Sequence, residues 1–356
     1  MYKKTLFAIS IIFTAYTAQA DDKSFLATVF TTISDKHLTE VASEDLSVSG
    51  LKVLSSIDKN LTFANGKDMV YLYYKGKSAA MWRKPKNNKD TKAWASLVVE
   101  IIEKAAKISP TVNQQKEDIA EKVIHDSVDA LQDHSQYHFA EEPDKDISQD
   151  RFSAQSYDNI LYVRIKEFGT NTPKLFRNAI ISRPHTSGII LDLRGNHGGQ
   201  LSSAIEIAQM FIDDGIIVST IGRGDEAVKY YVAHTQPQII NLPLAVLIDK
   251  NTASSAEMLA AALQEQIQAT IIGTISYGKG TIQDTFVFDN GGRLALTTAE
   301  FFAPSGSKIE KIGILPDYCI LNDQQLTNNS CSQQKREGRP FDVDFAQKIL
   351  KKKIDG

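Results

Sequence analysis

The chain has 356 residues, of which 42% are hydrophobic and 23% are charged, and its formal net charge is −3. This composition excludes collagen-like, coiled-coil and disulfide-stapled miniprotein architectures, as well as a largely disordered chain. The length is sufficient for one large domain or two ordinary ones. The near-neutral charge gives no indication of a nucleic-acid partner.

The first twenty residues have the three parts of a secretory signal peptide. Lys3 and Lys4 precede an apolar stretch at residues 6–15, and Ala18-Gln19-Ala20 follows as a small-x-small cleavage site. The apolar stretch is shorter than the roughly 20 residues of a membrane-spanning helix. We therefore expect cleavage after Ala20, a periplasmic or secreted protein, and no membrane anchor. The mature chain then carries −5, because 38 basic residues remain against 43 acidic ones.

Residues 21–150 are predicted to form a mostly helical N-terminal domain. Apolar residues recur with helical spacing at 25–30, 48–54, 94–102 and 119–131. A short β-hairpin is predicted where residues 69–74 and 79–82 flank the turn-forming 75–78. The polar residues 141–146 are expected to be a linker.

From residue 151 to residue 320, apolar β-type runs alternate with helical patterns. Strands are expected at 160–165, 188–193, 215–219, 244–248 and 269–272, and helices at 174–181, 202–211 and 256–266. This alternation predicts an α/β domain with a largely parallel sheet covered on its faces. A hairpin is expected between 285–288 and 294–298, and the C-terminal segment 321–356 is expected to be a loop followed by a helix at 341–354.

Three segments of the α/β region could carry chemistry. The first, 191–199, ends in Gly198-Gly199 after a buried strand, where backbone amides can approach an anion; an ordinary tight turn is the alternative. The second places Ser254 at the start of a helix, where the helix dipole favours developing negative charge. Ser254 and Glu257 also match a capping box, which needs no catalysis.

The third segment is Tyr277–Gln283, in which glycines flank Lys279. Burial would lower the pKa of this lysine, and a neutral amine can accept a proton from a serine hydroxyl. A solvated loop lysine is one alternative, and a phosphate-binding loop is another. Gly273-x-x-x-x-Gly278-Lys279 matches a P-loop except at Gly280, where a Mg²⁺-binding serine or threonine is required.

Together these motifs resemble the carboxyl-terminal processing proteases, the tail-specific peptidases of family S41. The resemblance covers residues 160–320 and rests on 251–254, on 278–283, on 191–199 and on 313–317. It implies a ClpP/crotonase-like α/β core in which Ser254 is the nucleophile and Lys279 the general base, with Gln283 orienting the lysine. Gly199 and the amide of Ser255 would form the oxyanion hole.

The sequence departs from this family in three places. His197 stands where proline or glycine is usual. About twenty residues separate Tyr137 from Asn159, too few for the PDZ domain that the family usually carries there. Residues 61–85 match no part of the family. A preference for free carboxyl termini is therefore not implied, and residues 61–85 or an adaptor protein are hypotheses for substrate delivery.

Two further constellations are alternatives to a Ser-Lys site. His134 and His138 have the i,i+4 spacing of helical metal ligands, but the glutamate of an HExxH motif is absent. His197 could belong to a Ser-His-Asp triad, although the chain contains no Gly-x-Ser-x-Gly elbow. We expect no metal and no organic cofactor.

The sequence therefore predicts an exported serine endopeptidase that acts on cell-envelope proteins or peptides. A non-catalytic peptide- or lipophile-binding protein on the same fold is the alternative. Cys319 and Cys331 have eleven residues between them, and export would place them in an oxidising compartment. We expect a disulfide between them, with two free thiols as the alternative.

Overall fold

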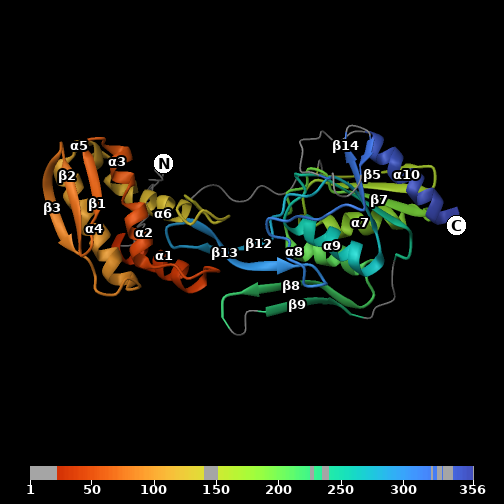
Figure 1. Cartoon of the computed structure of the whole chain (residues 1–356), viewed down its shortest axis with the longest axis horizontal. Coiled ribbons are helices and arrows are strands. Elements are labelled where there is room, and N and C mark those ends of the chain that lie inside the picture. The colour runs from red at the N-terminus through yellow and green to blue at the C-terminus, as the bar shows by residue number, and fades with distance from the viewer. Residues whose placement is uncertain are drawn as a thin grey trace, which may run out of the picture.

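The computed structural model describes residues 22–139, 151–224, 228–234, 240–321, 324–326, 331 and 340–355. The predicted signal peptide and the predicted linker lie outside these residues. Figure 1 shows two lobes, with helices and a small sheet at one end, an α/β lobe at the other, and strands β12 and β13 between them. In the part of the chain that is described, none of the helices has the length and apolar character required to span a bilayer.

The N-terminal lobe is built around amphipathic helices. Helix α4 begins where the side chain of Asp90 accepts a hydrogen bond from the amide of Ala93 (3.0 Å), and α5 begins at Pro110 after the capping Ser109. The helices are α1 (Asp22–Lys36), α2 (Ser43–Gly50), α3 (Val53–Ile57), α4 (Thr91–Ile108), α5 (Pro110–Gln114) and α6 (Ile119–Asp129), with a 3₁₀ turn at Lys116–Asp118.

A small antiparallel sheet covers one side of these helices. Its strands lie in the order β1 (Leu61–Asn65), β2 (Met69–Tyr74) and β3 (Lys77–Arg83). The predicted hairpin is confirmed, and β1 is an additional strand that the sequence pattern did not indicate. Val70 and Leu72 alternate along β2 and are buried in the helical core, which leaves the intervening side chains on the outer face.

The α/β lobe contains a seven-stranded sheet in the order β15-β14-β11-β10-β7-β6-β5. The five inner strands are parallel and the two outer strands are antiparallel, which confirms the expected largely parallel sheet. The strands are β5 (Phe152–Tyr157), β6 (Ile160–Ile165), β7 (Gly188–Asp192), β10 (Leu244–Ile248), β11 (Thr270–Gly273), β14 (Tyr318–Leu321) and β15 (Gln324–Leu326).

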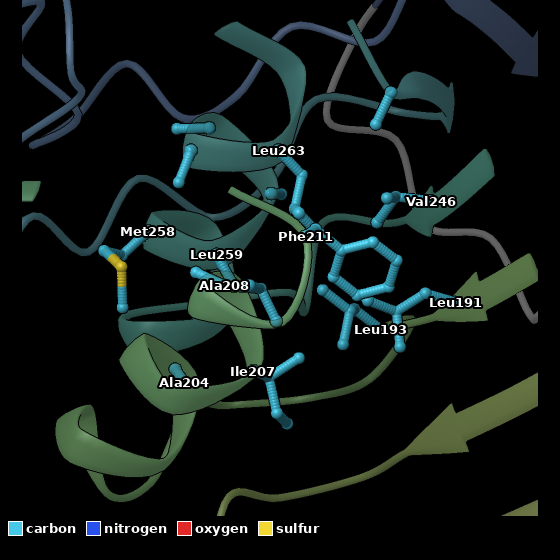
Figure 2. Close-up of a cluster of buried hydrophobic side chains, with 14 of the residues drawn as sticks. Leu191, Leu193, Ala204, Ile207, Ala208, Phe211, Val246, Met258, Leu259 and Leu263 are labelled. Carbon is cyan, nitrogen blue, oxygen red and sulfur yellow. The ribbon is translucent and has the colours of Figure 1, made fainter. Parts of the chain in front are cut away.

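Helices cover both faces of this sheet. Helices α7 (Thr172–Ile181), α8 (Leu201–Gln209) and α9 (Ser255–Ile267) pack on one face, and α10 (Pro340–Asp355) packs on the other. Figure 2 shows α8 and α9 meeting over β7 and β10, where Phe211 lies among Leu191, Val246 and Leu263. Every residue from Ser255 to Leu263 is buried, so the start of α9 is held by close packing on all sides.

A second sheet, in the order β12-β13-β8-β9, lies beside the first, and β4 (Gln136–His138) pairs with its strand β13. Its strands are β8 (Gly215–Gly222), β9 (Val228–Ala233), β12 (Thr281–Val287) and β13 (Arg293–Phe302). The expected hairpin is therefore confirmed and extended. Placing 215–219 in the alternating α/β series was wrong, because β8 pairs antiparallel with distant β13 rather than with a neighbouring parallel strand.

Strand β13 connects the two lobes. Leu294 and Leu296 are fully buried, and together with Tyr137 they belong to the hydrophobic cluster of the N-terminal helices. Phe288, in the turn before β13, packs edge to face on Phe25 of α1 with ring centroids 6.0 Å apart. The core of the N-terminal lobe thus contains residues from the far end of the sequence.

Candidate active site

The first loop of the site follows the fully buried strand β7. Asp192 lies at the end of this strand, and its carboxylate forms a bidentate ion pair with Arg194 (2.6 and 2.9 Å). Arg194 also pairs with Asp342 of α10 at 2.9 Å, and Tyr162 donates to Asp192 at 2.6 Å. Burial opposes the charge of Arg194, but the two carboxylates outweigh it and raise the pKa of the guanidinium. The network fixes where the loop leaves the sheet.

Two glycines bring this loop against the start of α9. Gly198 has φ +104°, and a Cβ at this position would lie 2.9 Å from the Cβ of Ser254. Gly199 has φ +125°, and a Cβ there would collide with the backbone of Phe168. The amide of Gly198 donates to Asn196 Oδ1 at 2.7 Å. Gly199 is therefore the member of the pair whose amide is left for another acceptor.

Ser254 stands at the junction between β10 and α9. Its backbone has φ +56° and ψ −126°, a conformation that non-glycine residues rarely adopt and that concentrates at functional sites. Ser255 is the first residue of α9, where helical geometry leaves the amide without an intrahelical acceptor. The hydroxyl of Ser255 donates to the carbonyl of Gly199 at 3.3 Å, which ties the helix start to the glycine loop.

The capping glutamate does more than the sequence suggested. Glu257 has no exposed surface, and its Oε2 accepts hydrogen bonds from the amides of Ser254 and Lys279, both at 2.9 Å. Its Oε1 accepts from the hydroxyl of Ser276 at 2.5 Å and from the amide of Gly278 at 2.6 Å. Burial raises the pKa of this carboxyl, although the four donors oppose the shift. One carboxylate therefore joins the backbones of the serine and the lysine.

Lys279 lies in the loop between β11 and β12. Burial lowers the pKa of its amine, and the negative charges of Glu310 and Glu257 partly oppose this shift. Glu310 is fixed near the lysine because its carboxylate accepts a hydrogen bond from the amide of Gly280 at 2.8 Å. Sequence reasoning missed Glu310, because this residue is 31 positions beyond Lys279 and matches no motif.

Gln283 lies on β12 and faces the same cavity as Lys279. Its Nε2 donates to the hydroxyls of Thr281 (3.0 Å) and Thr297 (3.2 Å). These contacts fix the orientation of the amide group, and no donor among the described residues is bonded to its Oε1. Thr297 belongs to β13, so the orientation of Gln283 depends on the hairpin.

A cavity of about 690 Å³ brings the predicted residues together. It is lined by Ser254, Ser255, Lys279, Gly199 and Gln283. Its other walls come from β8, β9 and β13, and from the end of α1. A serine hydroxyl, a lysine amine of lowered pKa and two amides with no acceptor among the described residues thus share one cleft, an arrangement suited to acyl transfer.

The structure weighs against the metal and nucleotide alternatives. His134 and His138 do not share a helix, because Gln136–His138 is strand β4, and no metal-binding group of three acidic, histidine or cysteine residues occurs in the described ranges. Burial lowers the pKa of His134, and the charge of nearby Lys279 lowers it further. In a P-loop, the amides of Gly278 and Lys279 would donate hydrogen bonds to phosphate. Here they donate hydrogen bonds to the carboxylate of Glu257 instead.

His197 lines the cavity and is exposed to solvent. The described residues include no carboxylate hydrogen-bonded to its ring, which a Ser-His-Asp triad requires. Cys319 and Cys331 are joined by a disulfide in the structure, with their Cα atoms 5.6 Å apart.

Residues 159–320 match the sequence model of peptidase family S41. Over this segment, the chain is similar to the members of peptidase family S41. The S41 segment includes all the cavity residues discussed above except those contributed by α1. It ends at the strand that carries Cys319.

The chain is similar to several processing proteases. It is 37% identical over 204 residues to the carboxy-terminal-processing protease of Bartonella bacilliformis, covering 56% of this chain and 45% of that protein. It is 35% identical over 161 residues to the carboxyl-terminal-processing protease of a Synechocystis species, covering 45% of this chain and 37% of that protein. The chain thus spans less than half the length of these curated relatives.

The fold of a lipoprotein from Streptococcus agalactiae is similar over 89% of this chain and 99% of that chain, with a TM-score of 0.50 and 18% identity. At this identity the likeness concerns the fold alone. It nevertheless extends beyond the S41 segment into the N-terminal lobe.

Proposed function

We propose that this chain is an exported serine endopeptidase that hydrolyses peptide bonds of cell-envelope proteins with a Ser-Lys dyad. In this proposal, Ser254 attacks the peptide carbonyl and Lys279 accepts its proton. The amides of Gly199 and Ser255 bind the oxyanion, and Gln283 orients the lysine through its Oε1. The match of residues 159–320 to the S41 family model and the shared cavity support these roles.

The observation that carries the proposal is the buried carboxylate of Glu257, which binds the backbone amides of both Ser254 and Lys279. A serine that merely capped α9 would not need its cap to be bonded to a distant lysine loop. Because each oxygen of Glu257 accepts two donors and the side chain has no exposed surface, a shift of either loop breaks hydrogen bonds that water cannot replace. Glu257 thereby fixes the backbone of Ser254 relative to the backbone of Lys279.

The reaction proceeds in two halves. The neutral amine of Lys279 takes the proton of the Ser254 hydroxyl as the new C–O bond forms, and the negative charge develops on the former carbonyl oxygen beside the amides of Gly199 and Ser255. The lysine then gives this proton to the departing amine as the C–N bond breaks. A water molecule, deprotonated by the same lysine, hydrolyses the acyl-enzyme and restores the serine.

The test compares two adjacent serines. Ser254→Ala should abolish both peptide hydrolysis and labelling by a fluorophosphonate probe, with the circular dichroism spectrum unchanged. Ser255→Ala is the comparison, because it keeps the amide that the proposal uses and removes only the hydroxyl that donates to Gly199, so labelling at Ser254 should persist even where hydrolysis slows. Hydrolysis at the normal rate by the Ser254→Ala protein would overturn the proposal, and absence of labelling in the unmodified protein would favour a non-catalytic peptide- or lipophile-binding protein.

Substrates of the chain should accumulate in cells in which its proposed nucleophile is absent. Envelope proteins that accumulate in a strain carrying Ser254→Ala, identified by mass spectrometry, are the expected substrates. Deletion of residues 61–85 should reduce cleavage of some of them if this segment delivers substrates. If every substrate were cleaved as before, delivery by an adaptor protein would be the remaining form of the proposal.

A further inference from the structure

Positive charge is concentrated in one short segment of the chain. Residues 59–92 contain nine lysines and arginines but only two acidic residues, so this segment carries +7 in a chain whose net charge is −3. The segment comprises the sheet β1-β2-β3, the loop that leads to α4 and the first two residues of α4, which include Lys92. Figure 1 places this sheet at the end of the molecule away from α9. The proposed catalytic cavity does not account for this charge.

The outer face of the sheet is apolar and aromatic at its centre. Tyr71 and Tyr73 project from this face of the central strand, with their rings stacked 6.4 Å apart. Met81, which pairs with Tyr71 across the sheet, is 64% exposed. A methionine that is this exposed in the middle of a strand contributes little to the core of its own lobe.

Cations surround this centre at both ends of the sheet. Lys75 and Lys77 are exposed in the β2–β3 turn, and Lys75 is hydrogen-bonded through its amide to the carbonyl of Asn60, next to the exposed Lys59. Lys67 and Arg83 are exposed at the opposite end. Two other lysines of the segment are already paired, Lys84 with Glu44 and Lys89 with Glu40.

We propose that the outer face of β1-β2-β3 docks on the surface of an anionic lipid bilayer. Lysines at the rim would lie against lipid phosphates, the tyrosine rings would lie at the level of the headgroups, and Met81 would insert into the acyl boundary. The exposed Met81 and the mutual stacking of Tyr71 and Tyr73 favour a bilayer over single-stranded nucleic acid, which needs open aromatic faces for its bases. This proposal does not depend on the catalytic assignment.

Vesicle sedimentation with the purified mature chain tests the proposal. Binding is expected to vesicles of 70% phosphatidylcholine and 30% phosphatidylglycerol, and not to phosphatidylcholine alone. Binding should weaken steeply between 0.05 and about 0.5 M NaCl, because salt screens the surface potential. Equal binding to both vesicles, or retention on an oligothymidylate resin without vesicle binding, would overturn the proposal.

Three variants test whether this face of the sheet is the surface that binds vesicles. K75Q/K77Q should weaken vesicle binding about 30-fold, since each lysine near an anionic leaflet contributes roughly fivefold in affinity. K174Q/K352Q is the matched control, because it removes two exposed lysines outside this segment, and its binding should change less than about twofold. M81S should weaken binding roughly tenfold with its salt dependence retained, because it removes the apolar contribution alone.

All these positions are exposed, so each variant should keep the circular dichroism spectrum and the probe labelling of the parent chain. Loss of binding in K75Q/K77Q with the fold retained supports the proposal. An equal loss in K75Q/K77Q and K174Q/K352Q would show that total charge, and not this face, decides binding, and would refute it.

Discussion

Replacement of Glu257 by glutamine is the sharpest test of how the site is held together. A glutamine Oε1 can keep the two bonds from Ser276 and Gly278, but its NH₂ group would face the amides of Ser254 and Lys279, which are also donors. The substitution thus loses two hydrogen bonds to a buried charged acceptor, each worth about 1.5–3 kcal/mol.

Part of this loss is offset because a neutral amide costs less to bury than a carboxylate, which is why burial raises the pKa of Glu257. We therefore expect a net fall of about 3 kcal/mol in the free energy of unfolding, measured by urea titration. Turnover should fall by about 100-fold, because the backbones of Ser254 and Lys279 both lose a hydrogen bond that positions them, and a displacement of a catalytic group by about 1 Å has an effect of this size.

Glu265→Gln provides the control on the same helix. Glu265 is exposed and its carboxylate accepts from the amide and hydroxyl of Ser305, so water can replace these bonds. Its loss should cost less than about 1 kcal/mol and leave turnover unchanged. If the Glu257→Gln protein matched this control in both stability and turnover, the reasoning about the shared carboxylate would be refuted.

Three further outcomes are expected. The rate of peptide hydrolysis should rise with pH through the lowered pKa of Lys279. Glu310→Gln should move this rise to lower pH, because the carboxylate of Glu310 raises the pKa of the lysine. A pH profile of kcat/KM that stays in place or moves to higher pH would contradict the assignment. Gly198→Ala should reduce turnover at least tenfold, because its Cβ would press on the proposed nucleophile, and should lower the free energy of unfolding by about 1–3 kcal/mol, because alanine is strained at φ +104°. Normal turnover would show that the loop can move to accommodate the Cβ. Cys331→Ser should lower the free energy of unfolding by about 3 kcal/mol, because the bridge to Cys319 closes a short loop. Thiol titration of the unfolded, unreduced parent chain should find no thiol, and two reactive thiols would be inconsistent with the bridge.

Local patterns were sufficient to predict most elements of the α/β lobe. The apolar runs of β6, β7 and β10 are long, buried on both faces and separated by amphipathic helices, so their type and order follow from periodicity. The motifs at 191–199, 251–254 and 278–283 each follow a strand of this sheet, and parallel strands place their carboxyl ends at one edge.

Long-range pairing could not be predicted in the same way. The sequence of β8 would suit either sheet, and only its contact with β13 determines that it lies in the antiparallel one. Glu257 was visible as a cap because the cap lies within four residues, but its bonds to Gly278 and Lys279 cross more than twenty positions. The hydroxyls that orient Gln283 come partly from Thr297, on the far side of a hairpin turn. None of these contacts can be recognised from residues that are neighbours in the sequence.

Strand β13 has a consequence for the order in which the protein can fold. The helices of the N-terminal lobe emerge first during synthesis, yet their core is completed by Leu294 and Leu296, which are translated after most of the chain. Until then the part of the helical core against which these two leucines pack stays exposed, a state that favours retention by chaperones. The S41 segment and the N-terminal helices should therefore become protease-resistant together, in one late step.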